Sequence, residues 1–109
     1  MIDKSKYPKA TKVLGEWILK KAKLYGQSAE VLQQVPVENM VDMVLGADGR
    51  VLYEFLDDYH LQCGVICMAD GQWKWRVNDI HPMEGFATSR VEAESKVYNE
   101  GLLRLEQRL

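Results

Sequence analysis

Four residues in the second half of the chain have side chains that bind zinc or act as nucleophiles and bases: His60, Cys63, Cys67 and His81. Zinc sites commonly hold paired cysteines on a tight turn, with about two to four residues between them. Cys63 and Cys67 instead fall within a predicted strand, in which they would lie about 13 Å apart at about 3.3 Å per residue. One ion cannot bridge that distance. The sequence therefore predicts two buried thiols and no metal site.

Catalysis by these residues is not indicated either. A nucleophilic cysteine needs a neighbouring base or positive charge, and the sequence identifies no such environment for either thiol. His60 follows Asp57 and Asp58 and has the chemistry of a general base, but the same run also fits a polar loop. The chain contains no phosphate-binding glycine loop, no Gly-x-Ser-x-Gly elbow and no His-Glu-x-x-His motif. We expect a protein that is not an enzyme and carries no cofactor.

The elements that position these side chains belong to one domain. The chain has 109 residues, of which 47% are hydrophobic and 28% are charged, and this balance is typical of a single globular domain. We expect this domain to span residues 1–109, with residues 1–7 flexible. No apolar run approaches the roughly 18 residues of a membrane span, and the N-terminus lacks the apolar stretch of a secretory signal. We therefore expect a cytoplasmic protein with both cysteines reduced.

Charge is unevenly distributed along the chain, although the net charge is only −2. Residues 1–25 contain seven lysines and two acidic residues, whereas residues 26–85 contain three basic and ten acidic residues. A lysine-rich helix can contact nucleic-acid phosphates, but the acidic remainder would repel the same polymer. Nucleic-acid binding is therefore the alternative function. Its candidate residues are Lys12, Lys20, Lys21 and Lys23.

The first third of the chain has a helical pattern. Apolar residues recur at three- and four-residue spacing after Pro8, which suits the first turn of a helix, and Gly26 is a typical C-terminal stop. A second, short helix is predicted over Ala29–Val35, with Ser28 as its N-cap and Pro36 after its end.

The middle of the chain has the pattern of β-hairpins. The tripeptide Ala-Asp-Gly occurs at 47–49 and again at 69–71, and Asp-Gly supplies the backbone angles of a tight hairpin turn. The predicted strand pairs are Met40–Leu45 with Arg50–Leu56 and Leu61–Met68 with Gln72–Asn78. Together they form a four-stranded antiparallel meander. The spacing of the apolar residues in 37–45 also fits a helix that ends at Gly46, and this alternative stays open.

Alternation along the predicted strands assigns side chains to the two faces of the sheet. Trp73, Trp75 and Val77 point to one face, which must be covered, and Lys74 and Arg76 point to the other. The second face combines charged with aliphatic side chains and is more apolar than a solvated face requires. We expect it to bind another protein or a second copy of this chain. The candidate residues for this contact are Glu54, Ile66, Met68, Lys74 and Arg76.

The last helix is predicted to follow a loop that contains His81, Pro82 and Gly85. Ser89 and Glu92 have the spacing of a capping box, which marks the start of a helix. The helix then carries a heptad-like stripe of mostly apolar residues, namely Val91, Ser95, Tyr98, Leu102, Leu105 and Leu109. We expect this stripe to pack against the sheet, and a dimer seam near the last three leucines is the alternative.

The segment from Gly71-Gln-Trp-Lys-Trp-Arg-Val to Gly85-Phe-Ala-Thr-Ser-Arg-Val-Glu-Ala resembles a pattern in small phage and mobile-element proteins. In these proteins a tryptophan-bearing strand leads through a glycine turn into a capped helix rich in alanine and glutamate. The resemblance covers only this part of the chain and transfers no catalytic or ligand-binding residue. It implies a small accessory protein that acts by binding.

The predicted fold class is α+β. An N-terminal helix and a short second helix precede a four-stranded antiparallel meander, and the C-terminal helix packs on the sheet. We expect the indole-bearing face of this sheet to be backed by the first and last helices. The favoured function is that of a non-enzymatic accessory protein that acts by protein–protein binding.

Overall fold

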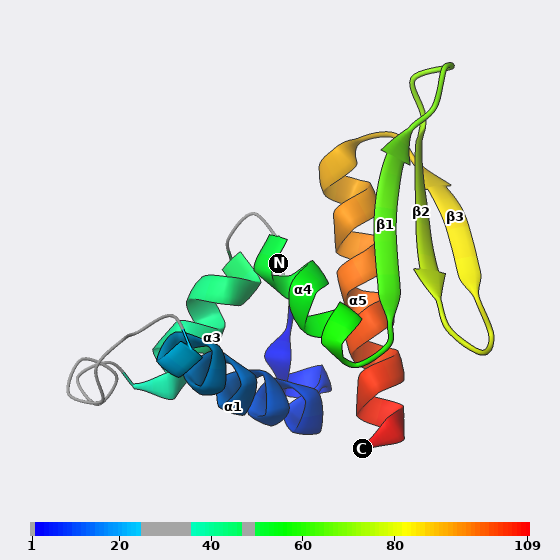
Figure 1. The fold of residues 1–109 in the computed structure, drawn as a ribbon. Coiled ribbons are helices and arrows are strands. Elements are labelled where there is room, and N and C mark those ends of the chain that lie inside the picture. Colours follow the sequence, from blue (N-terminus) through cyan, green and yellow to red (C-terminus); the bar gives the residue numbers. More distant parts are fainter. Residues whose placement is uncertain (1, 25–35, 47–49) are drawn as a thin grey trace.

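The computed structural model describes residues 2–24, 36–46 and 50–109, and it confirms the α+β class. Figure 1 shows the sheet and α5 on one side of the molecule, with α1 and α3 on the other. The elements are the 3-10 helix η1 (Lys4–Lys6), helices α1 (Pro8–Leu24), α3 (Val37–Gly46) and α4 (Arg50–Asp58), strands β1 (Gln62–Cys67), β2 (Trp73–Asn78) and β3 (Met83–Ala87), and helix α5 (Arg90–Arg108).

Three predicted features lie outside the described residues. They are the Gly26 helix stop, the short helix Ala29–Val35 and the Asp-Gly turn at 47–49.

Helix α1 forms as predicted and packs against α3 and α5. Ala10, Leu14 and Trp17 follow its three- and four-residue spacing and are buried. The Trp17 ring packs edge-on against Phe55 of α4, with the ring centroids 5.4 Å apart, and its Nε1 donates a hydrogen bond to Asp58. The expectation that the first helix backs the sheet is wrong, because its main partners are other helices.

The first predicted hairpin is wrong, because residues 37–46 and 50–58 form helices. For α3 the helical alternative is confirmed: the helix ends at Gly46, and Val41 is buried while Met43 is exposed. A short apolar run fits the period of a strand and that of a helix equally well. The packing of α3 against α1 decides between them.

Helix α4 buries Leu52, Phe55 and Leu56, which are spaced as one face of a helix. The strand prediction places Val51 on the same face as Phe55, but Val51 is exposed. Phe55 also packs against Tyr59, with ring centroids 5.2 Å apart. The second half of the predicted hairpin is therefore a helix whose apolar face belongs to the core.

The sheet has three antiparallel strands in the order β1–β2–β3, not four strands. The second predicted hairpin is confirmed, and Cys63 of β1 pairs with Val77 of β2. In its turn Gly71 has a φ of 86°, a left-handed conformation that glycine adopts without strain. The Gly71 N–H donates to the Met68 carbonyl and closes the turn.

Strand β3 replaces part of the loop predicted before the last helix. It pairs with β2 so that Gly85 lies opposite Trp75. A Cβ at position 85 would lie 2.8 Å from the Trp75 ring, so the indole packs there only because the residue is glycine. Pro82 and Gly85 favour loops in sequence patterns, and for this reason the strand was not predicted.

Helix α5 covers one face of the sheet, as predicted (Figure 1). At its start the Ser89 hydroxyl accepts a hydrogen bond from the Glu92 N–H, while the Glu92 carboxylate accepts from Thr88. One half of the predicted capping box is therefore present. Leu102 and Leu105 are buried within the chain, so these leucines of the alternative dimer seam belong to its own core.

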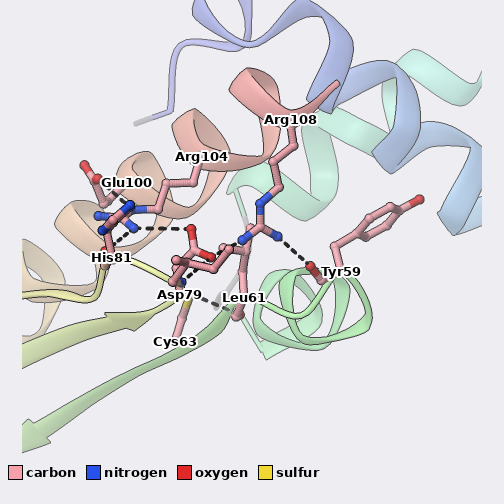
Figure 2. A network of polar contacts seen from close by, with 9 residues as sticks. Tyr59, Leu61, Cys63, Asp79, His81, Glu100, Arg104 and Arg108 are labelled. Atoms are coloured by element: carbon pink, nitrogen blue, oxygen red, sulfur yellow. Dashed lines mark hydrogen bonds and ion pairs between the residues drawn. The ribbon is translucent and has the colours of Figure 1, made fainter.

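The loop between β2 and β3 is tied to the C-terminal half of α5 by a cluster of charged side chains (Figure 2). Asp79 in this loop forms ion pairs with Arg104 and Arg108 of α5. Arg104 also donates to the carbonyl of His81, and Arg108 donates to the carbonyl of Tyr59. This Asp79 cluster fixes the segment that leads into β3.

Candidate functional site

The face of the sheet opposite α5, the open face, is the candidate binding site. Side chains alternate along β2, so Trp75 and Val77 are buried towards α5 while Lys74 and Arg76 point to the open face. The predicted assignment of these β2 side chains to two faces is confirmed. Cross-strand pairing arranges the open face in two rows, Ile66–Lys74–Phe86 and Gly64–Arg76–Glu84.

Large apolar side chains are exposed on the open face. Ile66 is 59% exposed and Phe86 is 60% exposed, and they lie on either side of Lys74. The Lys74 ammonium is 3.4 Å from the Glu84 carboxylate. The Arg76 guanidinium forms no ion pair or hydrogen bond with any residue that the structure describes. The open face therefore combines apolar contact area with a cation that the described residues leave unpaired.

A hollow of about 380 Å³ lies over β1 and β2 on this face. It exists because Gly64 has no side chain between its neighbours on the same face of β1. The lining includes Gln62, Gly64, Ile66, Lys74, Arg76 and Asn78. We call it the Gly64 hollow.

The structure brings together three of the five residues predicted to bind a partner, namely Ile66, Lys74 and Arg76. Met68 lies one residue beyond β1, at the start of the turn, and is exposed. Glu54 lies on α4 and not on the sheet, because the strand that was predicted to carry it is a helix. Its carboxylate lies 3.5 Å from the ammonium of Lys21, which belongs to the neighbouring helix α1.

Two residues of the open face were missed by sequence reasoning, Glu84 and Phe86. Both belong to β3, which was predicted as loop. The alternation of small or apolar with larger side chains over 83–87 is the signal that could have found them, but it is short and interrupted by Gly85.

The four residues considered for metal binding and catalysis lie in the turn before β1, on β1 itself and in the loop after β2. Within residues 2–24, 36–46 and 50–109, no three His, Cys, Asp or Glu side chains gather as metal ligands would. His60 lies in the turn between α4 and β1 with a φ of 63°, and the carbonyl of His81 accepts from Arg104. Cys63 and Cys67 are free thiols on β1.

We expect these two thiols to react at different rates with Ellman's reagent in the folded protein. Burial, followed by the charge of Asp57, raises the pKa of Cys63 to about 12, so almost none of this thiol is ionised at neutral pH. Cys67 is exposed, so the prediction that both thiols are buried is wrong. Cys67 should react quickly, and Cys63 only slowly or after denaturation. Cys67→Ser should remove the fast phase, and a fast phase that survives this substitution would contradict the assignment.

Lys21, one of the lysines considered for nucleic-acid binding, forms ion pairs with two carboxylates of its own chain. Its ammonium is 3.5 Å from the Glu54 carboxylate and 3.4 Å from that of Asp58. It also lies 5.5 Å from the centroid of the Trp17 ring, within the range of a cation–π interaction. Lys21 is therefore part of the contact between α1 and α4.

Lys12 and Lys20 are exposed on α1, and the side chain of Lys23 lies outside the described residues. A nucleic-acid surface that stacks bases needs exposed aromatic side chains beside its lysines. Tyr7 and Trp17, the aromatic residues described in this region, are buried. The described lysines of α1 thus offer phosphate contacts without a stacking surface.

No protein family model, curated protein or solved structure matches this chain. Among the described helices, none is long and apolar enough to cross a membrane.

Proposed function

We propose that this chain is a small, non-enzymatic accessory protein that binds another protein in the cytoplasm through the open face of its sheet. The contact region of the partner is apolar with acidic groups. The observation that carries this proposal is the placement of Ile66 and Phe86, both more than half exposed, beside Arg76, which pairs with none of the described residues. Aromatic and arginine side chains at the centre of an interface are typical of the residues that dominate binding energy.

The charge of the open face favours an acidic protein over a second copy of this chain. Lys74 and Arg76 carry two positive charges and Glu84 carries one negative charge, so the net charge of the face is positive. Two copies packed face to face would therefore bring together two surfaces of the same sign. It also favours protein over nucleic acid. Lys74, Arg76 and Glu84 together give the face a net charge of only +1, whereas binding a nucleic acid needs one cation for each phosphate that it contacts.

The size of the open face indicates weak, reversible binding. Three strands spaced about 4.8 Å apart, with about 3.3 Å per residue, span a face on the order of 300 Å². Stable complexes bury about 800 Å² on each partner. A transient contact is therefore expected from the open face alone, and a tighter one requires the partner to reach neighbouring exposed side chains such as Met68 and Ile80.

Site-specific photo-cross-linking in the cell tests this proposal. A benzophenone amino acid at position 86, on the open face, should give a discrete protein adduct on irradiation. The same photoprobe at the exposed Val91 of α5, on the other side of the sheet, should not give that adduct. Adding Arg76→Glu to the position-86 probe should lower the yield about tenfold, because a cation at the centre of the contact is replaced by an anion.

Three results would contradict the proposal. Equal adducts at positions 86 and 91 would show that other proteins contact the chain without preference for the open face. An adduct of twice the mass of the chain would identify a second copy as the occupant. An adduct that disappears on nuclease treatment would favour the nucleic-acid alternative, for which a gel shift that weakens with salt and with Lys12→Gln and Lys20→Gln is the direct measurement.

A further inference from the structure

Packing against the described residues does not require a glycine at position 64. An ideal Cβ there would meet none of their atoms within 4 Å, and the residue does not have the positive φ that requires glycine. Gly85 of the same sheet is different, because a Cβ there would meet the Trp75 ring at 2.8 Å. Glycine within a strand weakens it, and one cause of its presence is the close approach of a ligand or another backbone. Packing accounts for Gly85, whereas Gly64 keeps open a space that faces outwards.

The chemistry of the Gly64 hollow selects a negatively charged acceptor. Its polar lining consists of the Arg76 guanidinium, the Lys74 ammonium and the side-chain amides of Gln62 and Asn78. All four groups can donate hydrogen bonds. No carboxylate is among the described residues that line it. An arginine in such a position binds a carboxylate through two parallel hydrogen bonds.

The surroundings indicate that this carboxylate belongs to a protein side chain. Ile66 forms one wall of the Gly64 hollow, and Phe86 is exposed across Lys74 from it. An inorganic ion would leave both apolar side chains in water. An acidic residue with apolar neighbours in its own chain would cover them.

We infer that the Gly64 hollow receives an aspartate or glutamate side chain of the bound partner, with Arg76 as its counter-ion. This inference rests on the proposed function of the open face. Gly64 supplies the space, Arg76 supplies the charge, and Ile66 and Phe86 contact the residues on either side of the acidic one.

A pair of blocked pentapeptides tests the inference by NMR titration of isotope-labelled protein. One peptide has a glutamate between two isoleucines and a serine at each end, and the matched control has glutamine in place of the glutamate. At millimolar concentration the glutamate peptide should shift the amide signals of Gly64, Arg76 and their neighbours. The glutamine peptide should bind about tenfold more weakly, because the charge-assisted pair is lost.

Two variants make the test specific. Arg76→Gln should bring the two peptides to similar affinity. Gly64→Val should fill the hollow and weaken the glutamate peptide about tenfold, with a melting temperature equal to or above that of the unmodified chain, because valine favours a strand and a Cβ meets nothing there. Gly85→Val is the matched control that should lower the melting temperature.

The outcomes separate this inference from the proposed function. Equal binding of both peptides at the open face would overturn the carboxylate assignment and leave the face as a protein-binding site. Failure of both peptides to shift these signals, together with a position-86 cross-link that responds to Arg76→Glu, would also overturn the inference alone. Loss of the cross-link as well would overturn both.

Discussion

Replacing Leu52 with alanine should lower the free energy of unfolding by about 2–5 kcal/mol, the range for a leucine truncated in a closed core. Leu52 is 1% exposed on the inner face of α4, beside Phe55 and Leu56. Urea denaturation followed by tryptophan fluorescence would measure the change, since Trp17 lies against Phe55 in the same core. The loss is large relative to the total stability of a domain of this size, which is about 5–15 kcal/mol.

The neighbouring residue is the matched control. Val51→Ala should change the free energy of unfolding by no more than about 0.5 kcal/mol, because Val51 is exposed on the outer face of α4. A strand over the same residues predicts the reverse order, because it places Val51 on the buried face with Phe55 and Leu52 on the other. A larger loss for Val51→Ala than for Leu52→Ala would therefore contradict the helix. Leu52→Met, which keeps the volume, should restore most of the stability.

Replacing Asp79 with alanine should destabilise the fold by about 1.5–3 kcal/mol, the range for hydrogen bonds that involve a charged group. The Asp79 side chain is 13% exposed and is the shared partner of Arg104 and Arg108. Its loss would leave both guanidinium groups beside the loop without this carboxylate. Thermal denaturation followed by circular dichroism would measure the effect. Asp42→Ala is the control, since Asp42 forms an ion pair with Lys4 at 2.8 Å that is half exposed, and it should change stability by less than about 1 kcal/mol.

The Asp79 cluster also predicts a pH dependence. The hydrogen bond from the Ile80 N–H, and then the pairing with Arg104 and Arg108, hold the pKa of the Asp79 carboxyl below its ordinary value of 3.8. A lowered pKa in the folded state means that the carboxylate contributes fully above the ordinary pKa and loses its contribution as the pH falls through the lower value. The unmodified chain should therefore lose more stability on acidification below pH 3.8 than Asp79→Asn does. Parallel acid titrations of the two proteins would contradict the role of this carboxylate.

Local sequence signals were sufficient for α1, the β1–β2 hairpin and α5. Each depends on residues close together in the chain: Pro8 in a first helical turn, Asp70 and Gly71 in a tight turn, and the Ser89 hydroxyl at a helix start. The apolar spacing of α1 and α5 is long enough to exclude a strand.

Residues 37–58 carried conflicting local signals, because Gly46 fits the end of a helix whereas Asp48 and Gly49 fit a hairpin turn. Their apolar runs are short, and a run of this length matches both the two-residue period of a strand and the period of a helix. Helix α3 is selected by its packing on α1, and α4 by a core that takes Leu52, Phe55 and Leu56 together. These contacts join segments far apart in the chain, so no local pattern contains them.

The candidate site also has some features that the local sequence determines and others that depend on tertiary structure. Alternation within β1 and β2 is a local property, and from the sequence alone it placed Ile66, Lys74 and Arg76 on one face. Tertiary structure decided what lies beside them. Pairing with β2 turned residues 83–87 into a strand and added Glu84 and Phe86, while helix formation in α4 removed Glu54. The side on which a side chain points follows from its own strand, but its neighbours follow from hydrogen bonds and packing between distant segments.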